Sequence, residues 1–492
     1  MTTARPSPTA FLHGAPQPLR ISRQGWRLGP FDLYARVASD RRPSFLFESG
    51  KGPATTGQYS FFATDPYQIF SGTRHDWALR SADGHTQTGQ APFSTLARLM
   101  QQSAIPRPPG TPPFFGGAVG YLSYDLVRQF ESLPNHADDD LHFPDLEFAF
   151  YDLVAAFDHT SDEWHLMFCP PLERFLGEPR EKLYREGCDR LASLEAQLST
   201  PLPQLQSADS LTLVSFQPQQ SRDSYMDRVR RCQEFIAAGD LYQANLSHRF
   251  SVTNDGFTKQ AGLATELQTY ARLRSMNPSP FSGLLRIGNT SLISTSPERL
   301  VRLDGRSADT RPIAGTRRRG RDDSDDRHLR EELLGNEKER AEHLMLVDLE
   351  RNDLGRVCEF GSVLVDELMS IEQYSHVSHL VSHISGQLRT EVTGFDLLQA
   401  VFPGGTITGV PKIRCMEIID ELEPVRRGLY TGSMGYLSWS GDLDFNIIIR
   451  TLVLHEGRGY LQVGAGIVAD SDPAKEYEET MHKAQAFLSA LS

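Results

Sequence analysis

The most informative stretch of the chain is Phe402-Pro-Gly-Gly-Thr-Ile-Thr-Gly-Val-Pro-Lys412, a loop rich in glycine and threonine. The apolar run Asn446-Ile-Ile-Ile-Arg450 follows it and predicts a strand that ends in an arginine. Gly464-Ala-Gly466 comes next, and a last helix is expected to begin near Asp472-Pro473. Free backbone amides and an arginine suit the binding of a carboxylate. The C-terminal region therefore predicts a site for a small polyanion.

Two pairs of glutamates have the spacing that places both side chains on one face of a helix. Glu339 and Glu342 lie on a helix predicted over residues 328–350, and Glu476 and Glu479 lie on the last helix. Carboxylate oxygens are the ligands that Mg²⁺ prefers in proteins. The same spacing is also typical of an exposed helix surface. The residues alone leave both interpretations open.

Three histidines, His376, His379 and His383, recur in a segment that the spacing predicts to be helical. Such a face could bind zinc. The apolar residues between them favour instead a buried helix in which one histidine is hydrogen-bonded or catalytic.

Composition limits the partners that the chain can have. Its 492 residues are 39% hydrophobic and 23% charged, which is ordinary for a globular protein, and the formal net charge is −13. This negative balance argues against nucleic acids and anionic membranes. No apolar run is long enough to cross a bilayer, and the N-terminus lacks a secretion signal. Five cysteines without a Cys-x-x-Cys pair favour a reducing compartment. We therefore expect a cytoplasmic protein with neither a nucleic-acid nor a membrane partner.

Four regions are predicted along the chain. Residues 1–20 are expected to be a loose tail, residues 21–200 an N-terminal region of strands and turns, residues 201–220 a linker-like segment, and residues 221–492 the catalytic region. Strand runs and separate helices, without regular βαβ alternation, predict the α+β class. The linker-like segment separates regions of sequence and need not separate folding units.

Several helices and strands have clear signals. A helix is predicted over residues 180–198, and another begins after Ser221 or Asp223 and ends at Gly239. Strands are predicted around residues 241–250, 281–287 and 291–295.

Further motifs extend the pattern: Ser296-Pro-Glu-Arg299, Arg311-Pro-Ile-Ala-Gly-Thr316, Glu339-Arg-Ala-Glu342, Asp348-Leu-Glu-Arg-Asn-Asp-Leu-Gly-Arg356 and Gly464-Ala-Gly-Ile-Val-Ala-Asp-Ser471. Together with the Phe402–Lys412 loop they resemble the chorismate-utilising enzymes, in the branch of anthranilate synthase component I and aminodeoxychorismate synthase component I. The resemblance covers about residues 25–490. It implies a large α+β fold of the anthranilate-synthase-component-I type, with antiparallel sheets in a sandwich core and helices packed outside.

The resemblance also implies roles for residues at matching positions. The expected catalytic residues are Glu298, His379, Thr316 and Lys483. The expected substrate-binding residues are Tyr430, Arg450, Thr406, Gly464, Ala465, Gly466, Gln243 and Ala314. Glu342 and Glu479 are expected to hold Mg²⁺, with Glu339 and Glu476 beside them. Glu298 would act as the general acid and base for loss of the ring hydroxyl, and Mg²⁺ would hold and polarise the substrate.

The implied reaction is the addition of ammonia to chorismate. The isochorismate and salicylate synthases that the chain resembles carry a lysine at the position of Gln243, where it activates water. A glutamine cannot act as that base, so ammonia is favoured as the nucleophile. No Gly-x-Cys-x-Gly motif of the glutaminase kind occurs. The ammonia is therefore expected from a separate glutamine amidotransferase subunit.

The sequence leaves two products open. Ala314 favours anthranilate synthase, because aminodeoxychorismate synthases typically have a lysine there that attacks the ring. Asn277-Pro-Ser-Pro-Phe-Ser-Gly283, Tyr242-Gln-Ala-Asn-Leu246, Gly441–Ile447 and Phe130–Pro134 are instead similar to aminodeoxychorismate synthases. We expect an aminodeoxychorismate synthase component I of folate biosynthesis, with anthranilate synthase component I as the alternative.

The resemblance further implies a possible effector pocket. Its residues are Glu48, Ser49, Asn277, Pro278, Ser279, Pro280 and Phe281. They match the tryptophan pocket of the anthranilate branch, but Ser282 departs from that pattern, so inhibition by tryptophan is not expected. The catalytic residues named above disfavour the alternative that the chain is a non-catalytic effector-binding module.

Overall fold

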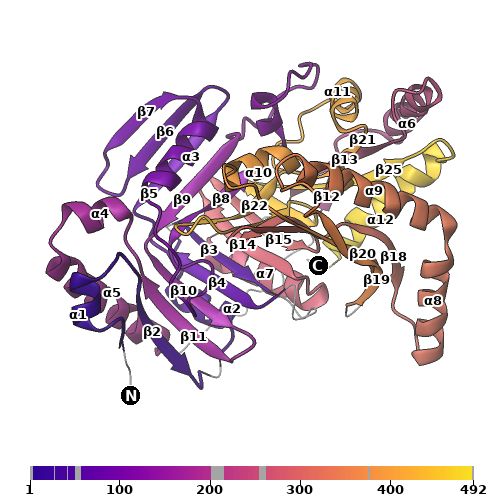
Figure 1. Cartoon of the computed structure of the whole chain (residues 1–492). Coiled ribbons are helices and arrows are strands. Elements are labelled where there is room, and N and C mark those ends of the chain that lie inside the picture. The colour runs from indigo at the N-terminus through magenta and orange to yellow at the C-terminus, as the bar shows by residue number, and fades with distance from the viewer. Residues whose placement is uncertain are drawn as a thin grey trace.

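Two large antiparallel sheets form the centre of the protein (Figure 1). The computed structural model describes residues 4–26, 28–40, 43–49, 57–200, 215–253, 262–374 and 377–489. The expected α+β class, with antiparallel sheets in a sandwich core, is confirmed. None of the helices in these residues is both long and apolar enough to cross a membrane.

The first sheet has thirteen strands in the described residues. Its order is β1 (Ala4–Arg5), β2 (Leu19–Gln24), β11 (Glu163–Phe168), β10 (Leu153–Asp158), β4 (Tyr59–Thr64), β3 (Ser44–Glu48), β14 (Phe281–Ile287), β15 (Thr290–Ser296), β24 (Thr451–His455), β25 (Arg458–Ile467), β13 (Gln243–Thr253) and β12 (Ser215–Pro218). The short strand β21 (Gly409–Val410) pairs with the beginning of β13.

The second sheet has twelve strands. Its order is β18 (Ile313–Arg318), β20 (Val377–Gln387), β17 (Ser307–Thr310), β16 (Arg299–Asp304), β23 (Leu443–Ile447), β22 (Ser433–Ser438), β8 (Gly117–Leu122), β9 (Leu146–Tyr151), β5 (Gln68–Thr73), β6 (Asp76–Ser81) and β7 (Thr86–Gln90). The remaining strand, β19 (Leu364–Gln373), also pairs with β20.

Helices pack on the outside of the sheets (Figure 1). They are α1 (Pro8–His13), α2 (Pro30–Val37), α3 (Pro92–Gln102), α4 (Leu172–Gly177), α5 (Arg180–Leu198), α6 (Arg222–Ala237), α7 (Leu263–Met276), α8 (Asp323–Gly335), α9 (Glu337–Gly355), α10 (Gly394–Val401), α11 (Lys412–Leu422) and α12 (Pro473–Leu488). Near the candidate site, α9 packs against β18 and β20, and α12 packs against β25 and α6.

Aromatic side chains from both sheets meet in one core. Phe45 of β3 lies 5.2 Å from Tyr151 of β9, and Phe61 of β4 lies 5.6 Å from Tyr436 of β22, measured between ring centroids. Burial of such large apolar surfaces is the main force that holds the sheets together. Since β3 pairs with β14, and β8 pairs with β22, strands from both sides of residues 201–214 share each sheet.

Many sequence predictions of elements are confirmed. The helix over residues 180–198 is α5, α6 is capped by the Ser221 hydroxyl, and α12 is capped by Asp472. The strand over residues 281–287 is β14. The linker-like segment is only partly described: residues 201–214 lie outside the described part, and residues 215–218 form β12.

Three local predictions are wrong. The segment of residues 328–350 is two helices, because Asn336 ends α8 and its side chain accepts a hydrogen bond from the Glu339 amide at the start of α9. The histidine-containing segment is strand β20, which pairs with β17, β18 and β19 and against which α8 and α9 pack. Residues 4–20 are not a loose tail, since Phe11 of α1 is fully buried against Phe175.

Candidate active site

Two crossings between the sheets place Glu298 and Arg450 together. The chain passes from β15 of the first sheet to β16 of the second at Glu298, and from β23 back to β24 at Arg450. The two crossings are joined by backbone hydrogen bonds from the Ile447 amide to the Glu298 carbonyl (3.0 Å) and from the Thr295 amide to the Arg450 carbonyl (3.1 Å). Arg450 has a left-handed backbone conformation, with φ of 48°. This conformation is costly for a residue with a side chain and is often found where function requires it.

Glu298 is a buried carboxyl group that titrates near neutral pH. Only 5% of it is exposed, and burial raises its pKa to about 7, although Thr406, the Ile313 amide and the Arg450 charge each lower it. The Thr406 hydroxyl lies close to this carboxyl, but neither it nor Glu298 Oε1 has a well-formed hydrogen bond to a described residue. A buried carboxyl that titrates near neutral pH can both donate and accept a proton.

Arg450 offers an unpaired cation beside this carboxyl. No described group forms an ion pair or side-chain hydrogen bond with its guanidinium, and burial lowers its pKa despite the charge of Glu298. An arginine that the protein leaves without a partner is suited to bind a carboxylate of a ligand.

His379 lies on β20 opposite Thr316 of β18. Burial and the Arg450 charge lower the pKa of His379 to about 3, so the imidazole is neutral at ordinary pH. The backbone of Thr316 lies in β18, but its side chain is outside the described part. His376 is outside it as well, and His383 pairs with Asp366 at 3.2 Å. The helical zinc-binding face considered from the sequence is therefore not present at His379 and His383, the two of these histidines that the structure describes, because both lie on a strand.

Arg427 anchors the Phe402–Lys412 loop in the site. It donates to the Ile407 carbonyl (2.9 Å) and to the Asn245 carbonyl, and it pairs with the buried Glu423. At the other end of the loop, Lys412 pairs with Asp353 of α9 at 2.5 Å. These contacts hold Thr406 toward Glu298. Sequence reasoning missed Arg427, because its motif carried no signal and its contact with the Asn245 carbonyl joins positions 182 residues apart.

The C-terminal part of β25 contains Gly464, Ala465 and Gly466. Strand β24 is too short to pair with these three residues. In this stretch β25 pairs with β13. A Cβ atom at Gly464 would lie 2.1 Å from Asn245 Oδ1 and 2.7 Å from the Tyr430 hydroxyl, and one at Gly466 would lie 2.8 Å from Gln243 Nε2. Glycine is therefore needed for polar groups to approach the strand closely.

Two buried oxygens face this glycine stretch without a partner. Gln243 Oε1 and Asn245 Oδ1 make no hydrogen bond to a described residue. Buried polar atoms without partners are costly unless a ligand or water satisfies them. Asn245 is a second site residue that sequence reasoning did not select, although its motif was noted. Lys483 holds the strand from the other side by donating to the Gly464 carbonyl at 2.8 Å.

The four glutamates approach one another from α9 and α12. The pKa of Glu342 is raised by burial and by the charges of Glu339, Asp470 and Glu476. The pKa of Glu476 is also raised, by burial and by Glu479. Glu479 pairs with Lys483 at 2.7 Å.

This acidic cluster is not arranged as a finished metal site. Glu339 pairs with Arg317 through Oε1, while its Oε2 atom has no hydrogen-bond partner in the described part of the chain. Within the described residues, no three acidic, histidine or cysteine side chains are grouped closely enough to hold a metal ion. The oxygen donors suit Mg²⁺, and ion binding would have to draw the two pairs closer.

Ala314 lies on β18 beside the site. It precedes Gly315, which has φ of 72° and whose Cβ would lie 2.6 Å from Glu339 Oε2. The preceding residue, Ile313, directs its amide toward Glu298. The backbone next to position 314 is therefore in contact with the candidate general acid.

The possible effector pocket is present but small. Glu48, Ser49, Pro280 and Phe281 line a cavity of about 70 Å³ between the sheets, whereas Asn277, Pro278 and Ser279 do not line it. The carboxylate of Glu48 is already bound by Tyr270 (2.8 Å) and Arg274 (2.7 Å). The Arg299 guanidinium lies 4.9 Å from the centre of the Phe281 ring, and it is fixed by Asp309 and Asp444.

Comparison with known proteins identifies relatives along nearly the whole chain. The model of the chorismate binding enzyme family matches residues 42–489. The chain is 44% identical to anthranilate synthase component 1 of Thermus thermophilus, over 94% of this chain and 95% of that protein. It is 40% identical to aminodeoxychorismate synthase component 1 of Bacillus subtilis, over 93% of each protein.

Solved structures show the same fold. Anthranilate synthase component I from Streptococcus pneumoniae superposes with a TM-score of 0.76 at 32% identity, covering 94% of this chain and 98% of that one. The menaquinone-specific isochorismate synthase of Escherichia coli gives a TM-score of 0.71 at 18% identity, covering 97% and 95%, and supports the fold alone.

Proposed function

The chain belongs to the chorismate binding enzyme family, and we propose that it adds ammonia to chorismate to form 4-amino-4-deoxychorismate. The observation that carries the aminating chemistry is the buried Glu298, with a pKa of about 7, beside the unpaired Arg450. A glutamine amidotransferase partner would supply the ammonia, as the name component 1 of the relatives implies.

Each group of site residues has a proposed task. Arg450 and Tyr430 bind the enolpyruvyl carboxylate, and the amides of Gly464–Gly466 bind the ring carboxylate. Glu298 in its protonated form gives its proton to the ring hydroxyl as that group leaves. His379, which is neutral, and Thr406 line the site, and Lys483 keeps the glycine stretch in place through the Gly464 carbonyl.

Mg²⁺ is the proposed cofactor. Glu342 and Glu479 would hold it, with Glu339 and Glu476 beside them. The support is electrostatic: carboxylates that raise one another's pKa bind a divalent cation favourably, since the cation removes their repulsion. When bound, Mg²⁺ would neutralise the ring carboxylate of chorismate and withdraw electron density from it.

The effector pocket favours aminodeoxychorismate as the product. Its volume of about 70 Å³ is far below the 300–1,000 Å³ that is typical of pockets for drug-sized ligands. Ser282 adds no volume, because its hydroxyl is turned to the Ser279 carbonyl at 2.9 Å. A cavity this small supports an enzyme without tryptophan feedback, which a folate-pathway enzyme does not need.

Anthranilate synthase is the second candidate function. Ala314 supports it, because alanine cannot form the covalent adduct with the ring that a lysine beside Glu298 would form. The 44% identity to an anthranilate synthase component 1 supports it as well. With Ala314, ammonia must attack the ring directly in either reaction.

Product analysis separates the two candidates. The chain is incubated with chorismate, Mg²⁺ and ammonium, and the products are separated by chromatography. We expect aminodeoxychorismate, which gives 4-aminobenzoate only after an added lyase. Anthranilate and pyruvate formed by the chain alone would establish the second candidate. If the chain forms neither aminodeoxychorismate nor anthranilate, both candidate functions are contradicted.

A further inference from the structure

The Arg427 side chain uses all of its hydrogen-bonding capacity beside the candidate active site. It is 3% exposed, and an arginine has five N–H donors. The Glu423 carboxylate accepts two of them, at 3.0 and 2.8 Å. The other three go to the Ile407 carbonyl at 2.9 Å, the Thr431 hydroxyl at 3.3 Å and the Asn245 carbonyl. The guanidinium therefore joins the end of α11 to β13, to the glycine- and threonine-rich loop and to the turn that precedes β22.

This turn has a strained backbone directly after Tyr430. Thr431 is left-handed, with φ of 60°, which is rare for a β-branched residue and persists only where the surroundings hold it. The Thr431 hydroxyl donates to the Tyr430 carbonyl at 2.6 Å and accepts from Arg427. The Thr431 amide donates to the Ile448 carbonyl at 2.9 Å. Arg427 thus supports the backbone conformation that follows Tyr430.

Arg427 also lies against the ring of Tyr430. Its Cζ atom is 5.7 Å from the centroid of that ring and 4.9 Å from the centroid of the Tyr124 ring. The face of an aromatic ring attracts a cation. Because the Tyr430 hydroxyl approaches Gly464, the position of the guanidinium affects where this hydroxyl lies in the site.

Stability alone does not explain an arginine at this place. Replacing a buried ion pair by apolar groups of similar volume is often neutral or stabilising. Pairing with Glu423 alone would need only one positive charge, which a lysine supplies. The three further acceptors need the planar fork of an arginine, and all three belong to segments that carry residues of the candidate site.

We propose that Arg427 is a positioning residue for the substrate, whose guanidinium holds Tyr430 where Tyr430 binds the enolpyruvyl carboxylate of chorismate. The proposal rests on the proposed function, because it concerns the substrate of that reaction. Arg427 acts through Tyr430, since its own five donors are already used. Glu423 in turn fixes Arg427, and it also accepts from the Ser247 amide of β13 at 2.8 Å.

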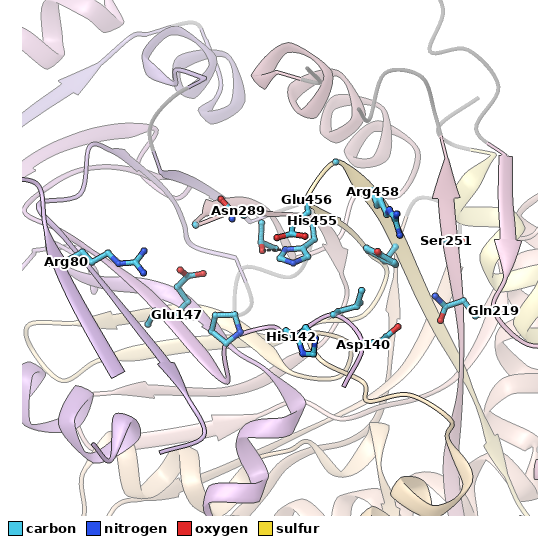
Figure 2. A pocket seen from close by; sticks show the side chains of 17 residues that line it. Arg80, Asp140, His142, Glu147, Gln219, Ser251, Asn289, His455, Glu456 and Arg458 are labelled. Atoms are coloured by element: carbon cyan, nitrogen blue, oxygen red, sulfur yellow. Dashed lines mark hydrogen bonds between the residues drawn. The ribbon is translucent and has the colours of Figure 1, made fainter. Parts of the chain in front are cut away.

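Arg427→Lys tests the proposal, because it keeps the charge beside Glu423 and removes the fork. Arg249→Lys is the matched control. Arg249 is 2% exposed, pairs with Asp140 and donates to Gln219 at 2.6 Å. Asp140 and Gln219 lie in an open polar cleft of about 1320 Å³, which none of the candidate site residues lines (Figure 2). Both variants therefore alter a buried ion pair, but only Arg427→Lys alters the support of Tyr430.

Two changes at Thr431 test the same link without altering a charge. Thr431→Ser keeps the hydroxyl that joins Arg427 to the Tyr430 carbonyl. Thr431→Val keeps the branched shape and the strained backbone, but it removes the hydroxyl and leaves one Arg427 donor without an acceptor. The difference between these two variants therefore measures the hydroxyl contact.

The measurement is the initial rate over a range of chorismate concentrations, at saturating ammonium chloride and Mg²⁺. We expect the chorismate KM to rise by about tenfold or more in Arg427→Lys, because a misplaced Tyr430 weakens binding of the carboxylate. Thr431→Val should raise it by about fivefold. Arg249→Lys and Thr431→Ser should stay within about threefold of the wild type.

A role in stability alone would give a different result. It would reduce the fraction of folded protein, which lowers the apparent kcat and leaves the chorismate KM unchanged. Urea unfolding gives the folded fraction of each variant. An unchanged chorismate KM in folded Arg427→Lys, or an equal rise in Arg249→Lys, would overturn the proposal. If Arg427→Lys does not fold, equal KM values in Thr431→Val and Thr431→Ser would overturn it.

The wild-type rate separately tests the proposed function. If the wild type forms neither amino product from chorismate and ammonium, that function fails. The Kd of chorismate, measured by calorimetry with Mg²⁺, then decides the role of Arg427. It should be about tenfold or more higher in Arg427→Lys than in the wild type, and an equal Kd would overturn the proposal. A wild type that does not bind chorismate would contradict both.

Discussion

At the scale of single residues, burial determines the chemistry of Glu298. An exposed glutamate has a pKa near 4.5 and is a poor acid at neutral pH, whereas burial raises the pKa of Glu298 to about 7. The sequence identified this residue by its motif. Its usefulness as an acid depends on the surrounding apolar walls, which come from both sheets.

Glu298→Gln should remove proton transfer and keep the shape of the site. We expect kcat to fall by about 10²–10⁴-fold with a chorismate KM within a few-fold of the wild type. Steady-state kinetics with ammonium as the second substrate checks this. A kcat within threefold of the wild type would show that Glu298 is not the general acid.

The same residue should make stability depend on pH. Because its pKa is higher in the folded state, the folded protein binds this proton more tightly than the unfolded chain. The stabilisation is present below about pH 4.5 and is lost as pH rises through about 7. Relative to Glu298→Gln, the wild type should lose up to about 1.4 kcal/mol of unfolding free energy per pH unit in this window. Urea unfolding at pH 5 and pH 8 measures it, and a constant difference between the two proteins would contradict it.

Helix α9 carries a second buried carboxyl, that of Glu350, which is close enough to Glu298 to be affected by its charge. The Thr310 hydroxyl has one hydrogen but two oxygen neighbours, the Leu300 carbonyl at 3.0 Å and Glu350 Oε2 at 2.7 Å. Both contacts are satisfied if Glu350 is protonated. Burial raises its pKa well above the ordinary value, and the charge of Glu298 raises it further.

Glu350→Gln should therefore be nearly neutral, since the amide can donate the same hydrogen bond. We expect a loss of unfolding free energy below about 1 kcal/mol, compared with about 1–3 kcal/mol for Glu350→Ala. Chemical denaturation at pH 7 compares the two variants. If Glu350→Gln is as harmful as Glu350→Ala, the carboxyl is charged.

At the scale of elements, helices α9 and α12 bring two pairs of glutamates close together. Glu339 and Glu342 lie on α9, and Glu476 and Glu479 lie on α12. Asn336 determines where α9 begins, and Asp472 determines where α12 begins. These caps set the position of the acid pairs along each helix. The repulsion between the pairs is a property of the arrangement and not of either helix.

Addition of Mg²⁺ should stabilise the wild type by about 2.7 kcal/mol at one hundred times the Kd of the ion. Glu342→Gln should raise the stability of the metal-free protein, because it removes repulsion, and should lose most of the gain from Mg²⁺. Glu478→Gln is the control, since Glu478 is an exposed residue of α12 that pairs with Arg222. Thermal unfolding with and without Mg²⁺ measures both effects, and equal gains in all three proteins would contradict a site at Glu342.

At the scale of the whole molecule, the two sequence regions are one folding unit. Strands β3 and β8 of the N-terminal region pair with β14 and β22 of the C-terminal region. A fragment of residues 221–492 would expose the edges of β14 and β22 together with their apolar faces. We expect this fragment, expressed alone, to show no cooperative unfolding transition by circular dichroism. A sharp transition with bound chorismate would show an independent domain.

Much of the fold and the site was predictable from the sequence. Local signals predicted α5, α6, α12 and β14, and the motifs selected Glu298 and Arg450, which the structure brings together. The residues around His379 were misread as a helix because the three histidines recur at helical spacing and the apolar residues between them lack the alternation that marks a half-exposed strand. Arg427 and Asn245 were not selected, since the contact that joins them links positions 182 residues apart and Asn245 faces the glycine stretch only through strand pairing.

The sequence by itself determined the family, the class of substrate and the types of residue at the site, because these depend on side-chain chemistry in an ordered set of motifs. Only the tertiary structure decided the near-neutral pKa of Glu298, the opposition of the two acid pairs and the small volume of the possible effector pocket. These properties depend on burial, on the distance between charges and on empty space. Such quantities exist only after the two sheets have packed together, since the residues that create them are scattered along the chain.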